Sequence, residues 1–288
     1  MVPPGRLERR RLKVRGGPAA FNARRQRALV LADSEPAMRD PLRFAAAVHS
    51  YLETRLGQPS VELSARHLAS SAGDGQRLDL GEVIDEILQE LDPARGALVP
   101  QAPADLGEAS EQLTINEVIA WASDPDQLSP AQRMWIQVAA APIVEQAAAQ
   151  IRPPAREAWS EASCPICGDA PRLSVIVEES GEFMRGSPRY LVCGRCASWW
   201  VFSRAVCPGC GEHHPDHLAL YTNDRWPWAR IDSCMTCRSF IKTFDLRQPG
   251  AGPVVPLIDD LATVTLDFWA VEQGLTGISR TGLRTRPQ

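Results

Sequence analysis

Eight cysteines are the residues of this chain with the clearest chemistry, because each belongs to a Cys-x-x-Cys pair and none lies outside residues 164–237. A Cys-x-x-Cys turn brings two thiolate sulfurs to one side of the chain, which is half of the ligand set of a tetrahedral metal ion. Four such pairs therefore predict two metal sites with four sulfur ligands each. The candidate ligands are Cys164, Cys167, Cys193, Cys196, Cys207, Cys210, Cys234 and Cys237.

The pairs also repeat as a unit. The motif Cys-Pro-x-Cys-Gly occurs at residues 164–168 and again at 207–211, and each copy precedes a second pair, at 193–196 and 234–237. Proline presets the turn of this motif, and the glycine tolerates positive φ. The similar gaps leave room for a β-hairpin, so we expect the first pair to share an ion with the second, and the third with the fourth. The spacing leaves open a cross-braced arrangement, in which the first pair joins the third.

Four cysteines around one ion leave no coordination position for water, so we expect no hydrolysis at the metal. The sequence has no phosphate-binding loop, nucleophile elbow or useful pair of carboxylates, and we therefore predict that the protein is not an enzyme. Zn²⁺ and iron both suit this ligand set, so a structural role and a redox or thiol-reactive role stay open. His213, His214 and His217 follow the third pair as alternative ligands, but we interpret them as a polar turn because the cysteines already fill both sites.

Composition and charge limit the classes of protein to which the chain can belong. Its 288 residues carry a net charge of −4, and no apolar run approaches the roughly 18 to 20 residues of a membrane helix. The arginine run at residues 9–11 is not followed by the apolar segment of an export signal, so we expect a cytoplasmic protein, in which cysteines bind metal rather than form disulfides. Residues 160–250 carry as many acidic as basic side chains, which argues against a nucleic-acid-binding module.

The first half of the chain is predicted to be helical, because its apolar residues recur at helical spacing. Caps and prolines set the expected bounds, and the apolar stripes are interpreted as core. Residues 94–110, rich in proline and small side chains, are expected to form a connector. The predicted helices run from an N-cap at Asp40 to Gly57, from Leu80 to a stop at Pro93, around Ile115 to Trp121, and from Ser129 onward with a kink or split at Pro142.

After Pro153 and Pro154 the pattern changes to short β-rich runs, at residues 172–179, 189–192, 199–204, 218–222 and 239–245. Seven of the aromatic residues in this half are expected to form the small cores of the modules, and any exposed remainder would suit peptide binding. They are Tyr190, Trp199, Trp200, Phe202, Tyr221, Trp226 and Trp228. Helical spacing returns at residues 259–274. Its apolar stripe is predicted to pack on the body and consists of Leu261, Val264, Phe268, Val271 and Leu275.

These patterns indicate an α+β, multidomain fold, with a helical N-terminal domain, two tandem rubredoxin-like or zinc-ribbon modules and a C-terminal helix. Each module is too small to be stable through core burial alone. We therefore expect metal removal to unfold residues 160–245 while leaving the helical half largely intact. The predicted boundaries are a basic disordered tail at 1–21, the helical domain at 22–155, the modules at 160–204 and 205–248, the C-terminal helix at 257–277 and a tail at 278–288.

The chain resembles the formate dehydrogenase accessory protein family, FdhE, over roughly residues 20–277, and all eight cysteines match one for one. The resemblance is most specific in the second half and weaker at Arg24–Ala32 and Leu42–Ala46. The motifs that carry it are Cys164-Pro165-x-Cys167-Gly168, Arg189-Tyr190-Leu191-x-Cys193-x-x-Cys196, Trp200 and Arg204 before Cys207-x-x-Cys210, Asp232-x-Cys234-x-x-Cys237 followed by Lys242 and Asp245, and Asp260-Leu261-Ala262, Leu266-Asp267 and Glu272-x-Gly274.

This resemblance implies a cytoplasmic maturation factor that is needed for active formate dehydrogenase, a molybdenum or tungsten enzyme, and that acts on the catalytic subunit before export. We accordingly expect a chaperone-like protein that binds the immature catalytic subunit, holds two metal ions (Zn²⁺ or Fe) in Cys₄ sites, and neither binds nucleic acid nor inserts into a membrane. The oligomeric state stays open. Two alternatives are an iron–Cys₄ redox or sulfur-handling module in molybdoenzyme maturation and a nucleic-acid-binding zinc ribbon protein.

Overall fold

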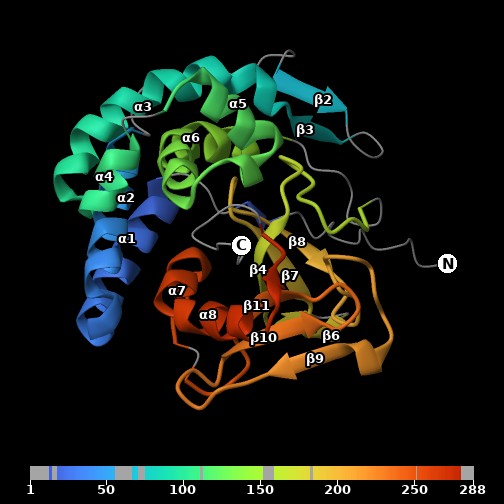
Figure 1. The fold of residues 1–288 in the computed structure, drawn as a ribbon. Coiled ribbons are helices and arrows are strands. Elements are labelled where there is room, and N and C mark those ends of the chain that lie inside the picture. The colour runs from blue at the N-terminus through green and yellow to red at the C-terminus, as the bar shows by residue number, and fades with distance from the viewer. Residues whose placement is uncertain are drawn as a thin grey trace.

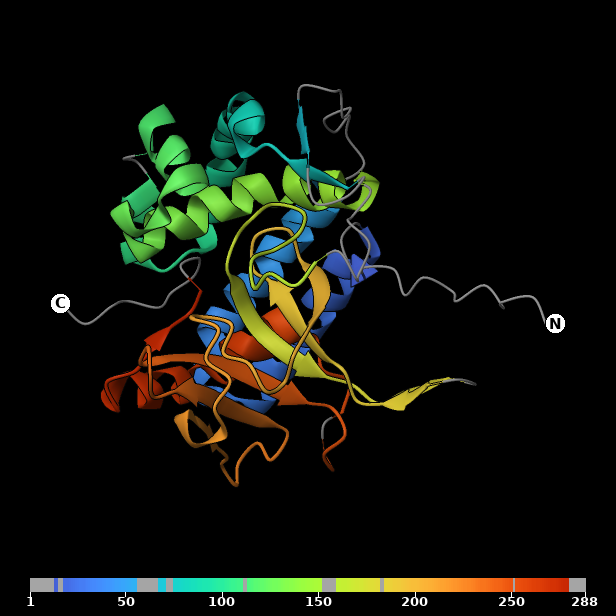
Figure 2. The same cartoon turned by 90° about the vertical axis from the view of Figure 1, so that its right-hand side faces the viewer.

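A layer of helices from the first half of the chain lies across one end of a mixed β-sheet from the second half (Figures 1 and 2). Two short helices near the C-terminus cover one face of that sheet (Figure 1). The arrangement confirms the predicted α+β fold. The computed structural model describes residues 13–14, 18–55, 67–70, 75–110, 113–151, 159–181, 184–250 and 252–279.

The helical layer is centred on α6, which contacts α2, α3, α4 and α5. Short 3-10 turns join the helices, and the hairpin of β2 (Leu68–Ser70) and β3 (Gln76–Leu78) reaches α6 through β3. The helices are α1 (Pro18–Ser34), α2 (Arg39–Arg55), α3 (Ile84–Leu98), α4 (Ala104–Ser110), α5 (Ile115–Ser123) and α6 (Pro130–Gln150). The 3-10 turns are η1 (Pro36–Met38), η3 (Leu80–Val83), η4 (Val99–Gln101) and η5 (Pro125–Gln127).

The start of α6 is where the sequence predicts it. The Ser129 side chain accepts a hydrogen bond from the Gln132 N–H (3.2 Å), and the Gln132 side chain accepts one from the Ser129 N–H (3.0 Å). This capping box satisfies N–H groups that have no partner within the helix. The predicted split at Pro142 does not occur, because α6 runs through it as one element. Buried neighbours such as Trp135 and Val144 offset the hydrogen bond that proline removes.

Two predicted helix ends are wrong. Pro93 lies inside α3 rather than after it, because Ala94 and Leu98, which are 0% and 1% exposed, continue the buried face of the helix. The expected connector at residues 94–110 therefore contains the end of α3 and all of α4. The predicted start of α2 is also wrong. This helix begins at Arg39 directly after η1, so Asp40 is its second residue and not its N-cap. The predicted stop at Gly57 and the boundary at Pro153 and Pro154 lie outside the described residues.

Helix α1 extends into the segment that the sequence assigns to a disordered tail. Residues 18–21 form its first turn, and Phe21 is fully buried. The Arg24 guanidinium donates a hydrogen bond of 2.7 Å to Glu145 of α6, and both side chains are buried. Further upstream, β1 (Lys13–Val14) pairs with β8 (Ser198–Phe202). Arginines interrupt the apolar positions of α1, which hides its helical periodicity in the sequence.

One sheet joins both cysteine modules, in the strand order β1-β8-β7-β4-β11-β10-β9 with β12 also pairing β11. The first module is an antiparallel unit of β4, β7 and β8, and the second is an antiparallel unit of β9, β10 and β11. The predicted runs correspond to β4, β7, β8, β9 and β11, whereas β1, β10 and β12 were not predicted. The strands are β4 (Pro171–Ile176), β7 (Arg189–Cys193), β8 (Ser198–Phe202), β9 (Leu218–Tyr221), β10 (Ala229–Cys234), β11 (Ser239–Asp245) and β12 (Thr276–Gly277), with a separate hairpin of β5 (Glu179–Gly181) and β6 (Met184–Gly186).

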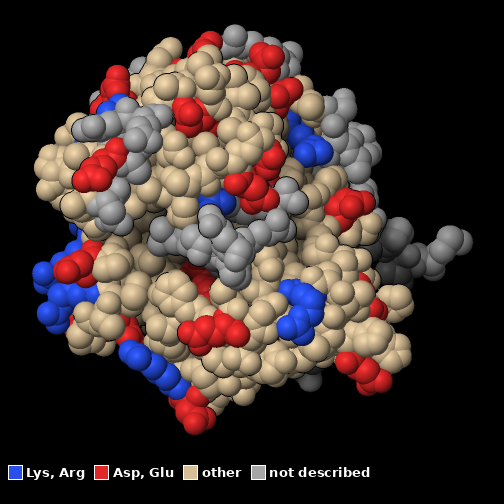
Figure 3. Space-filling model, viewed as in Figure 1, with Lys and Arg blue, Asp and Glu red and all other residues tan. Residues whose placement is uncertain are grey.

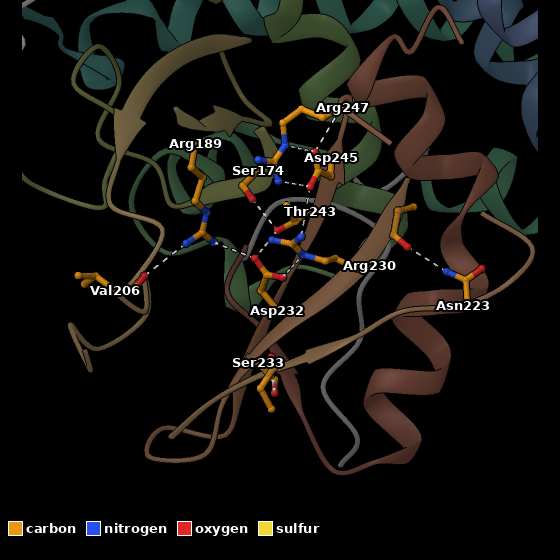
Figure 4. A network of polar contacts seen from close by, with 12 residues as sticks. Ser174, Arg189, Val206, Asn223, Arg230, Asp232, Ser233, Thr243, Asp245 and Arg247 are labelled. Carbon is orange, nitrogen blue, oxygen red and sulfur yellow. Dashed lines mark hydrogen bonds and ion pairs between the residues drawn. The ribbon is translucent and has the colours of Figure 1, made fainter. Parts of the chain in front are cut away.

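A parallel pairing of β4 with β11 connects the modules, and a buried polar network crosses it (Figure 4). Ser174 of β4 donates to Thr243 of β11 (2.6 Å), and the Thr243 hydroxyl donates in turn to Asp232 of β10 (2.7 Å). Asp232 also accepts a hydrogen bond from Arg230 (2.8 Å) and lies 3.8 Å from the Arg189 guanidinium of β7. The network therefore links strands of both modules.

The C-terminal segment differs from the single helix expected at residues 257–277. It forms α7 (Pro256–Ala262) and α8 (Val264–Glu272), followed by β12. The predicted apolar stripe is wrong at Phe268, which is 60% exposed. Carboxylates are buried instead: Asp259 pairs with Arg27 of α1, Asp260 with Arg172 of β4, and both Asp260 and Asp267 with Lys242 of β11. Because Lys242 is fully buried, the face that packs against it must supply negative charge.

Most of the aromatic side chains form core, as the sequence predicts. Tyr190, Trp199, Trp200 and Trp228 are buried, whereas Tyr221 on the edge strand β9 is 38% exposed. The two remaining members of the set, Phe202 and Trp226, are half-buried. Within the described residues, no helix combines the length and the apolarity that crossing a membrane requires.

Candidate metal centres

The structure gathers the eight cysteine sulfurs into two groups, and within each group all four lie within 4.8 Å of one another. The first pair joins the second and the third joins the fourth, which confirms the predicted pairing and excludes the cross-braced one. Centre 1 consists of Cys164, Cys167, Cys193 and Cys196, and centre 2 consists of Cys207, Cys210, Cys234 and Cys237.

The sulfur–sulfur distances fit a tetrahedral metal site. In centre 1 the Cys167 and Cys193 sulfurs are 3.5 Å apart, and in centre 2 the Cys207 and Cys237 sulfurs are 3.8 Å apart. Metal–sulfur bonds of about 2.3 Å in a tetrahedron place the sulfurs about 3.8 Å apart. A disulfide would require about 2.0 Å. The eight thiols are free, and the donor sets match Zn²⁺ or iron.

The backbone of the two centres repeats closely. In the first pair of each centre, the glycine after the second cysteine has positive φ, 78° at Gly168 and 80° at Gly211, as predicted. The N–H of each of these glycines donates 2.9 Å to the carbonyl of the first cysteine. After the second pair, positive φ recurs at Ala197 (58°) and Arg238 (57°). These two residues carried no sequence signal, because neither is glycine or asparagine.

Serines complete the repeat beside the last cysteine of each centre. The Cys196 sulfur lies 3.1 Å from the Ser198 hydroxyl, and the Cys237 sulfur lies 2.9 Å from the Ser239 hydroxyl. Backbone N–H groups also reach the sulfurs: Arg195 N–H donates to Cys193 (3.4 Å) and Gly209 N–H donates to Cys207 (3.3 Å). Such donors stabilise thiolates that bind a metal.

The thiols of centre 1 cannot all ionise without a cation. Burial raises the pKa of Cys164, Cys193 and Cys196. Hydrogen bonds from the neighbouring thiols lower the pKa of Cys167, and the nearby Arg195 charge adds to this. A buried divalent ion would offset the cost of burying four thiolates and stabilise all of them, so the environment of centre 1 suits a bound metal ion.

Centre 1 is part of the core of the helical layer. Its four cysteines belong to one cluster of buried side chains with Trp121 of α5 and Ile136 of α6. Arg195, between the second pair of cysteines, donates 2.8 Å to the Trp121 carbonyl and lies over the Trp121 ring at 4.3 Å. Its own carbonyl accepts a hydrogen bond of 3.0 Å from Gln137 of α6. These contacts fix the first module against two helices.

Centre 2 lies at the surface. Cys210 and Cys237 are exposed, whereas Cys207 and Cys234 are buried. At Cys237 burial acts to raise the pKa, but hydrogen bonds from Ser239 and the neighbouring thiols outweigh it and bring the pKa to about 7. The second module contributes no cysteine to the core that the helical layer shares with centre 1.

A surface network holds the two turns of centre 2 together. Glu212, which follows the third cysteine pair, accepts hydrogen bonds from the Thr236 hydroxyl (2.6 Å) and from His217 Nδ1 (2.9 Å). The backbone N–H groups of His213 and His214 also donate to Glu212. The hydrogen bond from Thr236 contributes most to holding the pKa of Glu212 well below its usual range, and those from the His214 N–H and the His217 ring add to it. These histidines are exposed and belong to neither sulfur group, as the predicted polar turn requires.

A cleft of about 1040 Å³ lies between the helical layer and the two modules. Both centres reach its wall, through Cys167 of centre 1 and Cys237 of centre 2. Arg77, Arg133 and Arg195 also line it, so much of the lining is polar. The sequence could not predict this cleft, because it is formed by segments that are far apart in the chain.

Basic and acidic side chains are interspersed on the face of the molecule in Figure 3, and the described residues form no continuous basic surface there. A module that binds nucleic acid concentrates its positive charge along one face. The balanced charge of residues 160–250 agrees with this view. Absence of nucleic-acid binding stays a prediction.

Comparison with known proteins gives a consistent set of similarities. A family model described as "FdhE, central domain" matches residues 163–204. The chain is 36% identical over 124 residues to a "Protein FdhE homolog" of Aquifex aeolicus (43% of this chain, 42% of that protein) and 27% identical over 268 residues to "Protein FdhE" of Salmonella paratyphi A (88% and 84%). It is also 34% identical to a "Protein FdhE homolog" of Haemophilus ducreyi, over 55% of this chain and 49% of that protein. The matches to the Aquifex aeolicus and Haemophilus ducreyi proteins therefore span less than half of the length of those proteins.

A solved structure extends the similarity to the whole fold. The crystal structure of the FdhE protein from Pseudomonas aeruginosa superimposes with a TM-score of 0.70 and covers 96% of this chain and 100% of that one. At 23% sequence identity the match concerns the fold alone. The helical layer and the sheet of this chain therefore belong to a fold that has been solved experimentally.

Proposed function

We propose that the chain is a member of the FdhE family and an accessory protein for formate dehydrogenase. The observation that carries the proposal is the match of the FdhE central-domain model to residues 163–204, which contain all four cysteines of centre 1. The fold of the surrounding chain agrees with it over 96% of the length.

The proposed role is chaperone-like: the chain binds the immature catalytic subunit in the cytoplasm and performs no reaction of its own. Four cysteines around each ion would leave no open position at which a substrate could be activated. The proposed function is therefore binding of the catalytic subunit through the protein surface. Eight free thiols also suit a reducing compartment.

Co-purification tests this role. We would co-express the tagged full-length chain with the catalytic subunit of formate dehydrogenase from the same cells. We expect the subunit without its cofactor to be retained and the mature subunit to be retained much less, because the proposed client is the immature form. Cells that lack the resident accessory protein should regain formate dehydrogenase activity when this chain is supplied. Equal retention of both forms, or no retention together with no regained activity, would contradict the proposal.

The eight cysteines are proposed as the ligands of two metal ions, one in each centre. Bound Zn²⁺ would supply folding free energy, on the order of 10 kcal/mol for a Cys₄ site, whereas bound iron would add one-electron chemistry. Elemental analysis of anaerobically purified protein should give two ions per chain. A colourless protein indicates zinc, and visible absorption from sulfur-to-iron charge transfer indicates iron. Fewer than one ion per chain would count against metal binding.

The exposure of two cysteines supports a redox or sulfur-handling role as a second candidate function. Two thiols of centre 2, Cys210 and Cys237, are exposed, so a redox partner or a sulfur donor could reach them. A reversible one-electron change in the absorption spectrum would favour this second function. A zinc-only protein whose thiols do not react would exclude it.

A further inference from the structure

We propose that the two centres differ in role: centre 1 is a permanent structural site, and centre 2 is an exchangeable site whose metal ion and thiolates are reached from solvent and from the cleft. The inference rests on the proposed binding of metal by the cysteines. It goes further, because it separates two sites that have the same four ligands and assigns ligand exchange to only one of them.

The ligands themselves give no reason for a difference. Both centres have the same order of motifs, the same pair of positive-φ positions and a serine beside the last cysteine. Both also place the N–H of the first cysteine on the carbonyl of the residue two positions after the second, at 2.8 Å in each case. Any difference in the rate of metal release must therefore come from the surroundings of the centres.

The surroundings of centre 1 close it. All four of its cysteines are buried, at 5% exposure or less. The Ile166 carbonyl, inside the first turn, accepts a hydrogen bond of 2.7 Å from Leu78 next to the helical layer, and Arg195 in the second turn is fixed to α5 and α6. Cys167 is the one ligand of centre 1 at the cleft wall, and it is only 5% exposed, whereas the other three cysteines have no exposed surface. A competing ligand can therefore displace these three sulfurs only after the module separates from the helices. Such an opening approaches the global unfolding of the protein and is correspondingly slow.

The surroundings of centre 2 leave it open. Cys210 and Cys237 are exposed, and Cys237 lies on the wall of the cleft together with Pro208 and Gly209 of the third cysteine turn. The contacts that hold its two turns together, those of Glu212 with Thr236 and His217, are themselves at the surface. A competing ligand can therefore attack the ion while the fold stays intact. Each metal–sulfur bond that breaks leaves a thiolate, which takes up a proton from water or reacts with an added electrophile.

Metal release from the full-length protein tests the proposal. Protein loaded with two equivalents of Zn²⁺ is mixed with excess 4-(2-pyridylazo)resorcinol, and the absorbance of the zinc complex is followed. We expect one equivalent to be released in a fast phase and one in a slow phase, with rates that differ by roughly 10- to 100-fold or more, because local opening is far more frequent than global opening. Release of both equivalents in a single phase would overturn the proposal.

Thiol labelling assigns each phase to a centre without any mutation. A pulse of N-ethylmaleimide during the fast phase, followed by peptide mass spectrometry, should modify Cys207, Cys210, Cys234 and Cys237 and spare the cysteines of centre 1. Modification of centre 1 first, or of all eight together, would overturn the assignment. If the protein binds no zinc, the proposed metal binding is contradicted as well. If it binds two ions that are released at identical rates, only the proposed difference between the centres is contradicted.

A matched pair of variants uses the internal repeat. Cys237→Ser and Cys196→Ser change the last ligand of each centre, and each lies beside an equivalent serine. Cys237→Ser should abolish the fast equivalent and leave the slow rate and the helical circular dichroism unchanged. Loss of the slow equivalent in Cys237→Ser would contradict the proposal. If Cys196→Ser does not fold, that result agrees with a permanent site, and the labelling of the unmodified protein still decides the question.

Discussion

At the scale of single residues, the cysteine turns depend on backbone that most side chains avoid. Gly168 and Gly211 have φ values of 78° and 80°. A side chain at Gly211 would meet nothing within 4 Å, but one at Gly168 would clash with the Arg77 guanidinium. Arg77 is flexible and can move away, so the strain of positive φ is the cost that both positions share.

Alanine at these glycines should therefore destabilise the folded protein at both positions. We expect Gly168→Ala and Gly211→Ala to lower the free energy of unfolding by about 1 to 2 kcal/mol each, because alanine is strained in the left-handed region. Gly96→Ala is the control: it lies inside α3 in open space, and alanine should raise stability there by about 0.5 to 1 kcal/mol. Denaturant unfolding of the metal-loaded proteins measures all three, and a Gly168→Ala variant as stable as Gly96→Ala would refute the argument.

At the scale of elements, the parallel pairing of β4 with β11 is the joint between the two modules. Ser174 and Thr243 lie opposite each other in its register and are fully buried. Their hydroxyls relay a hydrogen bond to Asp232 of β10, which Arg230 and Arg189 surround (Figure 4). A buried polar group is tolerated only when it is paired, so the joint depends on this relay.

Removing the Thr243 hydroxyl should weaken the joint. Thr243→Val keeps the shape of the side chain, but it leaves Ser174 without its acceptor and takes from Asp232 Oδ2 the hydrogen bond that Thr243 donates. We expect a loss of about 2 to 3 kcal/mol in the free energy of unfolding. Thr243→Ser retains the hydroxyl and should cost about 1 kcal/mol, for one methyl group. Adding Ser174→Ala to Thr243→Val should recover part of the loss, because one unpaired group is then gone. Equal stability of the valine and serine variants would show that packing alone holds the joint.

The elements also separate what the sequence could predict from what it could not. The sulfur groups were predictable because the repeated motif supplies the ligands and favours the pairing that the structure shows, although the spacing left a cross-braced pairing open. Ser129 was predictable because a capping box is local. Pro93 and the buried face of α8 were not. The helix passes Pro93 because distant residues bury Ala94 and Leu98, and Asp267 faces inward because Lys242 of another element is buried opposite it. Side chains that are far apart in the chain determine both, so no local pattern signals them.

At the scale of the whole molecule, the position of centre 1 indicates that metal removal should destabilise the helical layer as well as the modules. The small size of the modules alone predicts that the helical half survives metal loss. In the structure, however, the cysteines of centre 1 share one buried cluster with Trp121 and Ile136, and Arg195 is hydrogen-bonded to α5. Four thiolates without their ion would repel one another inside that cluster or take up protons and lose their geometry. If centre 1 binds the proposed metal ion, the helices that pack on this centre should depend on that ion.

Hydrogen exchange can separate the two centres at this scale. We expect amides of α5 and α6 to lose protection when both ions are removed, and to keep it when only the faster-released ion has gone. The residues of β9 and β10 should lose protection already at the first step, since they carry Cys234 and the edge of the second module. Helix α1, which reaches α6 through Arg24 and Glu145, is the internal comparison and should respond less than α5. If α5 and α6 stay protected after both ions are lost, the helical layer is stable by itself, and the shared core contributes less than its burial indicates.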